Sequence, residues 1–159
     1  SIALAGHNRL HGIWLDNNPA LTDLSPLNEC DFEYASEHGG LIFQYDNEKV
    51  KDLSFLSKVR YFCDLNLSGI NASVWVEAAA QPRIGRLVAF GFPNQKVFEA
   101  FIEAHQDIET LWIPWNTKVT DLSMLTELPN LKTVDISNTM KKAANSLKGK
   151  EYSFELIIE

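Results

Sequence analysis

Apolar residues recur at a fixed spacing along this 159-residue chain, and the clearest copies lie between residues 108 and 137. The first copy follows the full spacing L-x-x-L-x-L-x-x-N, and the second begins it again. The first contains Ile108, Leu111, Ile113 and Asn116, and the second begins 23 residues later with Leu131, Val134 and Ile136. Two aliphatic residues that flank a single residue share one face of a strand, because side chains alternate along an extended backbone. The pattern therefore predicts short strands, and an asparagine that ends a strand can satisfy backbone groups at the turn.

Counting in steps of 23 residues extends this pattern over most of the chain. The steps back from Val134 reach Leu111, Val88, Leu65 and Ile42, and the step forward reaches Ile157. The positions two residues further on are Ile136, Ile113, Phe90, Leu67 and Gln44, of which only Gln44 is polar. A complete copy of the pattern contains Leu10, Ile13, Leu15 and Asn18. Its Ile13 lies 29 residues before Ile42, instead of 23. Such a period predicts one small unit stacked on copies of itself.

A second phrase recurs in phase with the first. It reads Leu-Thr-Asp-Leu-Ser-Pro-Leu at 21–27, Val-Lys-Asp-Leu-Ser-Phe-Leu at 50–56 and Val-Thr-Asp-Leu-Ser-Met-Leu at 119–125. These segments are too short for a long helix, so we expect each to return through a single turn or a 3₁₀ segment. Asp23, Asp52 and Asp121 are then turn or cap residues.

Other connections have a helical pattern. Segment 71–80 begins with the capping candidate Asn71 and ends before Pro82, and Asn94 begins a helix with an apolar stripe at i,i+4 spacing. A third short helix is expected over 140–147, with Gly149 just after it. The extra residues of segment 28–40 predict an insertion on the convex side or at one edge.

We expect seven strand positions, including 11–16, 41–45, 87–92 and 152–158. In the fourth strand either Val88 and Phe90 or Leu87 and Ala89 face inward, and the two registers expose opposite sides.

Over nearly the whole chain these spacings resemble the leucine-rich repeat, and the Asp-Leu-Ser phrases are similar to those of the bacterial internalin-like class. The resemblance implies an α/β solenoid forming a short right-handed arc. Its concave side is a parallel sheet of about six to seven strands, and its convex side mixes short turns with helices. The single domain divides into repeats near 10–38, 39–61, 62–84, 85–107, 108–130 and 131–153, with a final strand at 152–158. The resemblance also implies a protein ligand at the concave face.

Composition narrows the choice of partner. The chain is 45% hydrophobic and 22% charged, and it lacks the apolar run of roughly 20 residues that a membrane span needs. A net charge of −7 argues against nucleic acid or anionic lipid and favours a basic or neutral protein surface. We expect Cys30 and Cys63 to be small buried residues, which slightly favours a cytoplasmic location over a secreted or cell-surface one.

Aromatic and acidic residues are expected on the concave face, where rigid aromatic groups are typical of protein interfaces. The candidate partner-binding residues are Trp14, Asp16, Phe43, Tyr45, Asp46, Asn66, Phe92, Trp112, Trp115 and Asp135. The alternative is that the aromatic residues cover a sheet edge or pack under the insertion. Trp75, on the expected helix, is assigned to the core.

The sequence therefore favours a non-catalytic protein-protein interaction module without a cofactor or a metal. No H-E-x-x-H, G-x-S-x-G, G-x-G-x-x-G or phosphate-loop motif occurs. One alternative is an immunity or antitoxin-type inhibitor of a basic protein. Another is a regulatory or catalytic domain that uses His11 with Glu37 and Asp46, and a third is a structural spacer. The apolar terminal strands predict either self-association or continuation into a longer chain.

Overall fold

Seven parallel strands form a single sheet in the computed structural model, which describes residues 7, 9–89 and 91–159. The strands pair in the order in which they occur in the sequence, so each lies beside its neighbour in the chain. They are β1 (Gly12–Trp14), β2 (Leu41–Gln44), β3 (Tyr61–Leu67), β4 (Arg83–Ala89), β5 (Thr110–Ile113), β6 (Thr133–Ile136) and β7 (Glu155–Ile158). This α/β arrangement is compatible with a repeat or solenoid-like fold.

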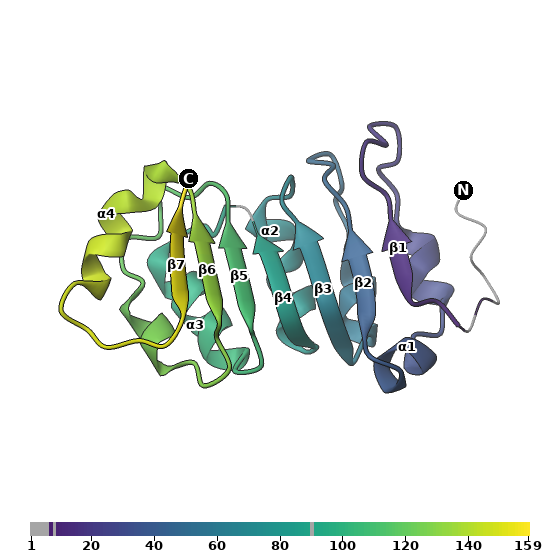
Figure 1. Cartoon of the computed structure of the whole chain (residues 1–159). Helices are drawn as coiled ribbons and strands as arrows, with labels where there is room; N and C mark the ends of the chain where they lie inside the picture. Colours follow the sequence, from purple (N-terminus) through teal and green to yellow (C-terminus); the bar gives the residue numbers. More distant parts are fainter. Residues whose placement is uncertain (1–6, 8, 90) are drawn as a thin grey trace.

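The connections between strands are short helices. The α-helices are α1 (Glu33–Glu37), α2 (Ala72–Trp75), α3 (Gln95–Ala104) and α4 (Lys141–Ala144). The 3₁₀ helices are η1 (Ser25–Glu29), η2 (Ser54–Lys58), η3 (Ala78–Ala80), η4 (Ser123–Glu127), η5 (Asn138–Met140) and η6 (Asn145–Leu147). Figure 1 shows α2 and α3 behind the sheet, and the opposite face, here called the outer face, turned toward the viewer without a covering helix.

The three Asp-Leu-Ser phrases form the expected 3₁₀ turns, η1, η2 and η4. In each, the aspartate Oδ1 accepts a hydrogen bond from the backbone N–H of the serine two residues later. The N···O distances are 2.9 Å for Asp23, 2.8 Å for Asp52 and 2.7 Å for Asp121. The prediction that these aspartates are turn residues is confirmed.

The helical connections also begin and end where the sequence indicates. Asn71 Oδ1 accepts from Ser73 N–H at 3.0 Å, and Asn94 Oδ1 accepts from Val97 N–H at 3.0 Å. Along α3, the apolar stripe places Phe98, Phe101 and Ile102 in the core. Gly149 follows η6 with a φ of 75°, a left-handed conformation that favours glycine.

The strand-ending asparagines of two repeats are buried and bonded to the backbone. Asn47 Nδ2 donates to the carbonyls of Asn18 at 3.2 Å and Leu21 at 2.9 Å. Asn116 Nδ2 donates to the carbonyl of Phe92 at 3.3 Å, and its Oδ1 accepts from the N–H groups of Lys118 and Val119. Each asparagine satisfies backbone groups at its own turn, as predicted, since Asn47 Oδ1 likewise accepts from Lys49 N–H at 3.0 Å. The bonds from both Nδ2 groups to an earlier segment of the chain were not predicted.

The inward-facing side chains form a continuous row across the sheet, but the interval between them is not constant. The paired positions are Ile13, Phe43, Leu65, Leu87, Leu111, Val134 and Leu156, so the intervals range from 22 to 24 residues after a first step of 30. The fixed period of 23 is therefore only approximate.

The register of β2 differs from the prediction. Phe43 pairs with Leu65, and Leu41, Phe43 and Tyr45 are buried, whereas Ile42 and Gln44 lie on the outer face. A register shift between Leu41 and Ile42 accompanies this change, because Leu41 pairs with Phe62 whereas Ile42 pairs with Asp64. Between these two pairs β3 contains one residue more than β2. A count in fixed steps of 23 residues leaves this residue out, so it assigns the wrong side of β2 to the core. The inward assignment of Ile42 and Gln44 was wrong.

For β4 the structure selects the second of the two registers. Leu87 pairs with Leu65 and Leu111, and Ala89 pairs with Leu67, so Leu87 and Ala89 face the core. Val88 consequently lies on the outer face. Phe90, the inward residue of the first register, lies outside the described residues.

Trp75 lies in the core, as predicted, and is fully buried. Its Nε1 donates to the carbonyl of Ile70 at 3.3 Å, and its ring meets Phe92 and Phe101 edge-on at centroid distances of 5.5 and 5.3 Å. These aromatic contacts join α2 to α3 behind the sheet. Of the two cysteines, Cys30 is buried and Cys63 is half-buried.

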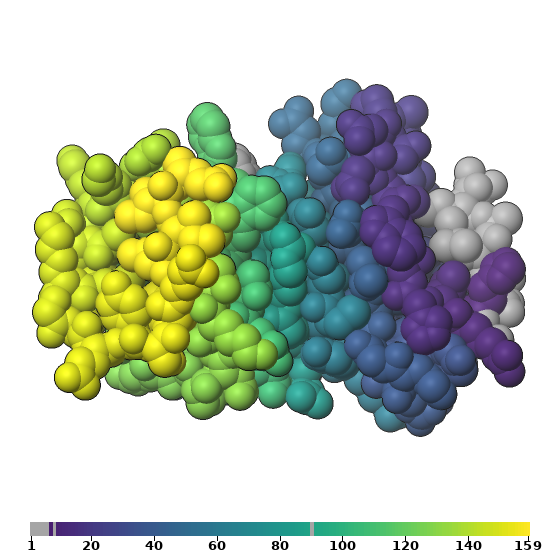
Figure 2. Space-filling model, in the orientation of Figure 1, coloured from purple at the N-terminus to yellow at the C-terminus, as the bar shows by residue number. Residues whose placement is uncertain are grey.

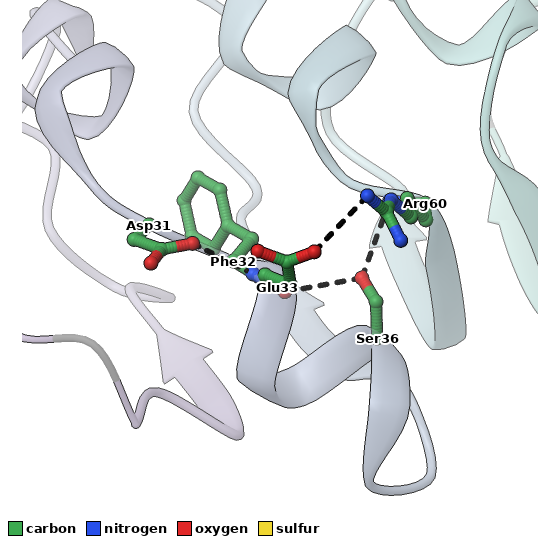
Figure 3. A network of polar contacts seen from close by, with 5 residues as sticks. All are labelled: Asp31, Phe32, Glu33, Ser36 and Arg60. Carbon is green, nitrogen blue, oxygen red and sulfur yellow. Dashed lines mark hydrogen bonds and ion pairs between the residues drawn. The ribbon is translucent and has the colours of Figure 1, made fainter.

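The insertion folds as α1 and is fastened to the next repeat by Arg60 (Figure 3). The Arg60 guanidinium lies 3.1 Å from a Glu33 carboxylate oxygen, and the Arg60 backbone N–H donates to Ser36 Oγ at 3.3 Å. Asp31 Oδ1 accepts from Glu33 N–H at 2.9 Å at the start of the helix. Because both ion-pair partners are exposed, these contacts position α1 more than they stabilise it.

Candidate functional site

The outer face is built from the side chains that alternate with the inward row. Across the sheet, the central row of this face is Trp14, Gln44, Asn66, Val88, Trp112, Asp135 and Ile157. The row beside it is Gly12, Ile42, Asp64, Arg86, Thr110, Thr133 and Glu155. In Figure 2 the yellow atoms of β7 and the purple atoms of β1 flank the teal centre of this face.

Trp14 is the most exposed aromatic residue of the outer face, with 59% of its surface accessible. Its indole lies over Gly12, since a Cβ at Gly12 would sit only 2.2 Å from the Trp14 ring. The missing side chain of Gly12 therefore lets a large ring lie along an edge strand. A ring held in this way loses little conformational entropy when a partner covers it.

Two apolar residues, Val88 and Trp112, lie side by side at the centre of the outer face. Val88 is fully buried although it lies on this side of the sheet, between Asn66 on β3 and Trp112 on β5. Trp112 is half-buried and lies between Val88 on β4 and Asp135 on β6. A valine that its neighbours cover and an indole beside it make a firm platform for an apolar group.

Opposite charges neutralise each other at one point on this face. Arg86 Nη1 donates to both oxygens of the Asp64 carboxylate, at 2.9 and 2.8 Å, across β3 and β4. Both side chains are partly buried. Arg86 is the only cation in the two rows given above, and the other charged residues of these rows, Asp135 and Glu155, are negative.

Two aspartates stand close together beyond the carboxyl ends of β1 and β2. Desolvation of the Asp16 carboxyl, followed by the charge of Asp46, raises the pKa of Asp16 above its usual range. Asp46 is exposed, and its Oδ1 accepts from the N–H of Asn17 at 3.3 Å. Neither aspartate forms an ion pair with a described residue, and a cation from outside would relieve their repulsion.

Asp135 carries a third carboxylate, between Trp112 and Ile157. Its Oδ1 is buried and has no hydrogen-bond partner among the described residues. Desolvation raises the pKa of Asp135, and the charge of Glu159 raises it further. The ionised form is therefore held at a free-energy cost.

The structure places the ten predicted site residues in four different locations. Trp14, Asn66, Trp112 and Asp135 lie on the outer face, and Asp16 and Asp46 lie beside it. Phe43, Tyr45 and Phe92 were placed on this face incorrectly, because all three are buried in the core. Trp115, which is 62% exposed, lies in the loop after β5 and lines a hollow at the sheet edge instead.

The sequence pattern did not indicate Val88, Arg86 or Gly12 as parts of this face. Val88 was missed because its inward or outward position depends on the register of β4. The glycine two residues before Trp14 was a usable signal, since residues i and i+2 share one face of a strand.

Among the described residues, His11 forms no ion pair with Glu37 or Asp46, the carboxylates expected beside it. Its ring meets Tyr34 edge-on at 5.0 Å and lies 6.5 Å from His38, while Tyr34 and His38 stack at 4.0 Å. Arg9 lies over the Tyr34 ring at 5.6 Å. Within the described part of the chain, no group of three or more His, Cys, Asp or Glu residues is arranged to hold a metal ion. Across the same residues, no helix combines the length and the apolar character needed to cross a membrane.

Comparisons of this chain with models of protein families, with curated proteins and with solved structures found no match.

Proposed function

We propose that this chain is a non-catalytic protein-binding module of the leucine-rich-repeat type, and that its outer sheet face is the binding surface. The repeat assignment is supported by the sequential parallel strands, by inward residues at intervals of 22 to 24 and by the recurring capped 3₁₀ turns. In such a solenoid the outer face is the concave lining of a short right-handed arc.

One observation carries the functional proposal. The outer face presents the exposed Trp14 on β1 and the half-buried Trp112 beside the buried Val88, and no helix of the described residues covers it (Figure 1). Ordinary parallel sheets are covered on both faces, because each face is apolar. A sheet that leaves one face open, with tryptophans on it, provides the kind of surface from which protein interfaces are built.

The partner is expected to be a protein with basic and apolar groups on one surface. Asp16 and Asp46 lie at one side of the outer face, beyond β1 and β2, and Asp135 and Glu155 lie at the other side, on β6 and β7. The single cation of the two rows, Arg86, is already paired with Asp64. Lysine or arginine side chains would complement the carboxylates and would also stack on the exposed Trp14 ring.

The test compares two variants that each remove exposed indole surface. Trp14→Ala/Trp112→Ala alters the outer face, and Trp115→Ala is the matched control because Trp115 is as exposed as Trp14 but lies elsewhere. Proteins captured by the wild-type chain should be lost with the double variant, with affinity at least about tenfold weaker, because a buried tryptophan commonly contributes 2 kcal/mol or more. They should be retained with Trp115→Ala. Capture of the same proteins by the double variant with unchanged affinity would refute the proposal.

A further inference from the structure

A second concave surface lies at the edge of the sheet, where the chain leaves β4, β5 and β6. A hollow of about 660 Å³ separates the loop after β5 from the α4 segment, and a smaller one of about 330 Å³ lies beside Trp115. The two hollows share Asn116, Thr117 and Thr139, so they form one continuous depression, here called the edge groove. Its size lies within the range of small-molecule sites.

The groove exists because neighbouring connections differ in length. The chain between the end of β5 at Ile113 and the start of η4 at Ser123 forms a long loop. After β6 only Ser137 precedes η5. The loop therefore extends beyond the sheet while the η5–α4 segment turns back at once, and a space remains between them.

Hydrogen bonds of Asn116 already hold the bottom of the edge groove in place without a ligand. Asn116 is buried, and its Oδ1 accepts from Lys118 N–H at 2.7 Å and from Val119 N–H at 3.1 Å. Its Nδ2 reaches the Phe92 carbonyl in the preceding repeat. These bonds tie the loop to the core, so little ordering is needed on binding.

The charge of the groove is opposite to that of the molecule. Its lining includes Lys118, Lys141 and Lys142 and contains no carboxylate, although the chain carries a net charge of −7. None of these three lysines forms an ion pair with a residue that the structure describes. Three unpaired ammonium groups around one depression attract an anion, and lysine binds phosphate well as a point charge.

The groove also contains an aromatic platform. Trp115 is 62% exposed and lines the smaller hollow, beside Pro93 and Lys118. An exposed indole provides a surface on which a flat ring stacks, and such stacking contributes about 1–3 kcal/mol in nucleic-acid complexes. The groove thus has a place for a ring at one end and for an anion along its length.

From this combination we propose that the edge groove binds a small organic phosphate that carries a flat ring, the chemical class of the nucleoside phosphates. The phosphate lies near Lys141 and Lys142, and the ring stacks on Trp115. Because the lysines are exposed and therefore screened, the dissociation constant is expected in the range of about 0.1–1 mM at low salt. This site is separate from the outer face and does not depend on the protein-binding function.

Calorimetric titration at low ionic strength tests the proposal with three probes, namely ADP, pyrophosphate and adenosine. ADP should bind most tightly, pyrophosphate more weakly, and adenosine should give no measurable heat. Lys141→Met/Lys142→Met should weaken binding of ADP and of pyrophosphate by at least about tenfold. Lys148→Met/Lys150→Met is the matched control, because it removes the same charge from the same segment outside the groove, and it should change neither constant by more than about twofold.

The role of the ring is tested separately. Trp115→Ala should weaken ADP by about fivefold or more and leave pyrophosphate unchanged, whereas Trp14→Ala should alter neither. The proposal is overturned if ADP shows no binding up to about 10 mM, or if Lys141→Met/Lys142→Met leaves ADP binding intact. Equal binding of ADP and pyrophosphate, together with no effect of Trp115→Ala, overturns the assignment of the ring and leaves a site for simple phosphates.

Discussion

At the scale of single residues, Asp135 shows most clearly that the outer face is not optimised for stability. Its Oδ1 is buried without a partner among the described residues, and desolvation and the charge of Glu159 raise its pKa. A buried acceptor without a donor costs about 1–3 kcal/mol. Residues that reduce stability in this way are often retained for function, and a cation from a partner would satisfy this oxygen.

We predict that Asp135→Asn stabilises the free protein by about 1 kcal/mol at neutral pH, because it removes the charge from this environment. The pKa of Asp135 is raised in the folded state. Ionisation therefore destabilises the fold at pH values above that pKa, and the penalty disappears as the pH falls below the pKa of the unfolded chain. The gain, measured by denaturant unfolding, should shrink from pH 7 into the acid range.

The control for this prediction is Glu155→Gln, which removes one charge from an exposed position on the neighbouring strand. It should change stability by less than about 0.5 kcal/mol. An unchanged or reduced stability of Asp135→Asn at pH 7 would contradict the description of this carboxylate.

Features that depend on a few adjacent residues were predicted well. The aspartates of the three Asp-Leu-Ser phrases and the caps Asn71 and Asn94 form the expected bonds, because each acts on a backbone N–H two or three residues away. No residue that is distant in the sequence takes part in these hydrogen bonds, so the local sequence was enough to predict them.

At the scale of elements, the registers of β2 and β4 could not be obtained by counting. A strand has only two possible faces, so one extra residue reverses the assignment. The bulge between β2 and β3 provides that residue, and a period averaged over the chain does not reveal it. The alternation of Leu41, Phe43 and Tyr45 was the better signal, since it is a property of the strand itself.

The register of β2 leads to a direct prediction. Phe43→Ala should cost about 3–5 kcal/mol, because it empties a fully buried position in contact with Phe55, with ring centroids 4.9 Å apart. Ile42→Ala should cost only about 1 kcal/mol, because Ile42 is half-buried on the outer face. The free energy of unfolding of the two variants measures the difference, and a larger loss for Ile42→Ala would reverse the register.

At the scale of the whole molecule, the sequence predicted the parallel sheet but only part of the candidate surface. Approximately regular intervals were enough to predict seven strands side by side. The division between outer face and core was only partly right, because Phe43, Tyr45 and Phe92 belong to the core. The edge groove was not foreseen, since it depends on where two connections of different length end relative to each other.

The charge distribution predicts how the proposed partner binds. With Asp16, Asp46, Asp135 and Glu155 around the outer face, the association rate constant with a basic partner should fall steeply as salt rises, while the dissociation rate changes less. Asp16→Asn/Asp46→Asn should flatten this dependence. Glu103→Gln/Glu127→Gln removes the same charge from exposed positions on α3 and η4 and should flatten it much less. Equal effects of the two variants would mean that net charge alone, and not this face, steers the partner.

The most direct test of the central claim is hydroxyl-radical footprinting of the tryptophans with and without a captured partner. We expect the partner to protect Trp14 and Trp112 and to leave the labelling rate of Trp115 unchanged, because Trp115 lies at the sheet edge and the other two lie on the outer face. Unchanged labelling of Trp14 and Trp112 in the complex, with or without protection of Trp115, would show that the partner binds elsewhere.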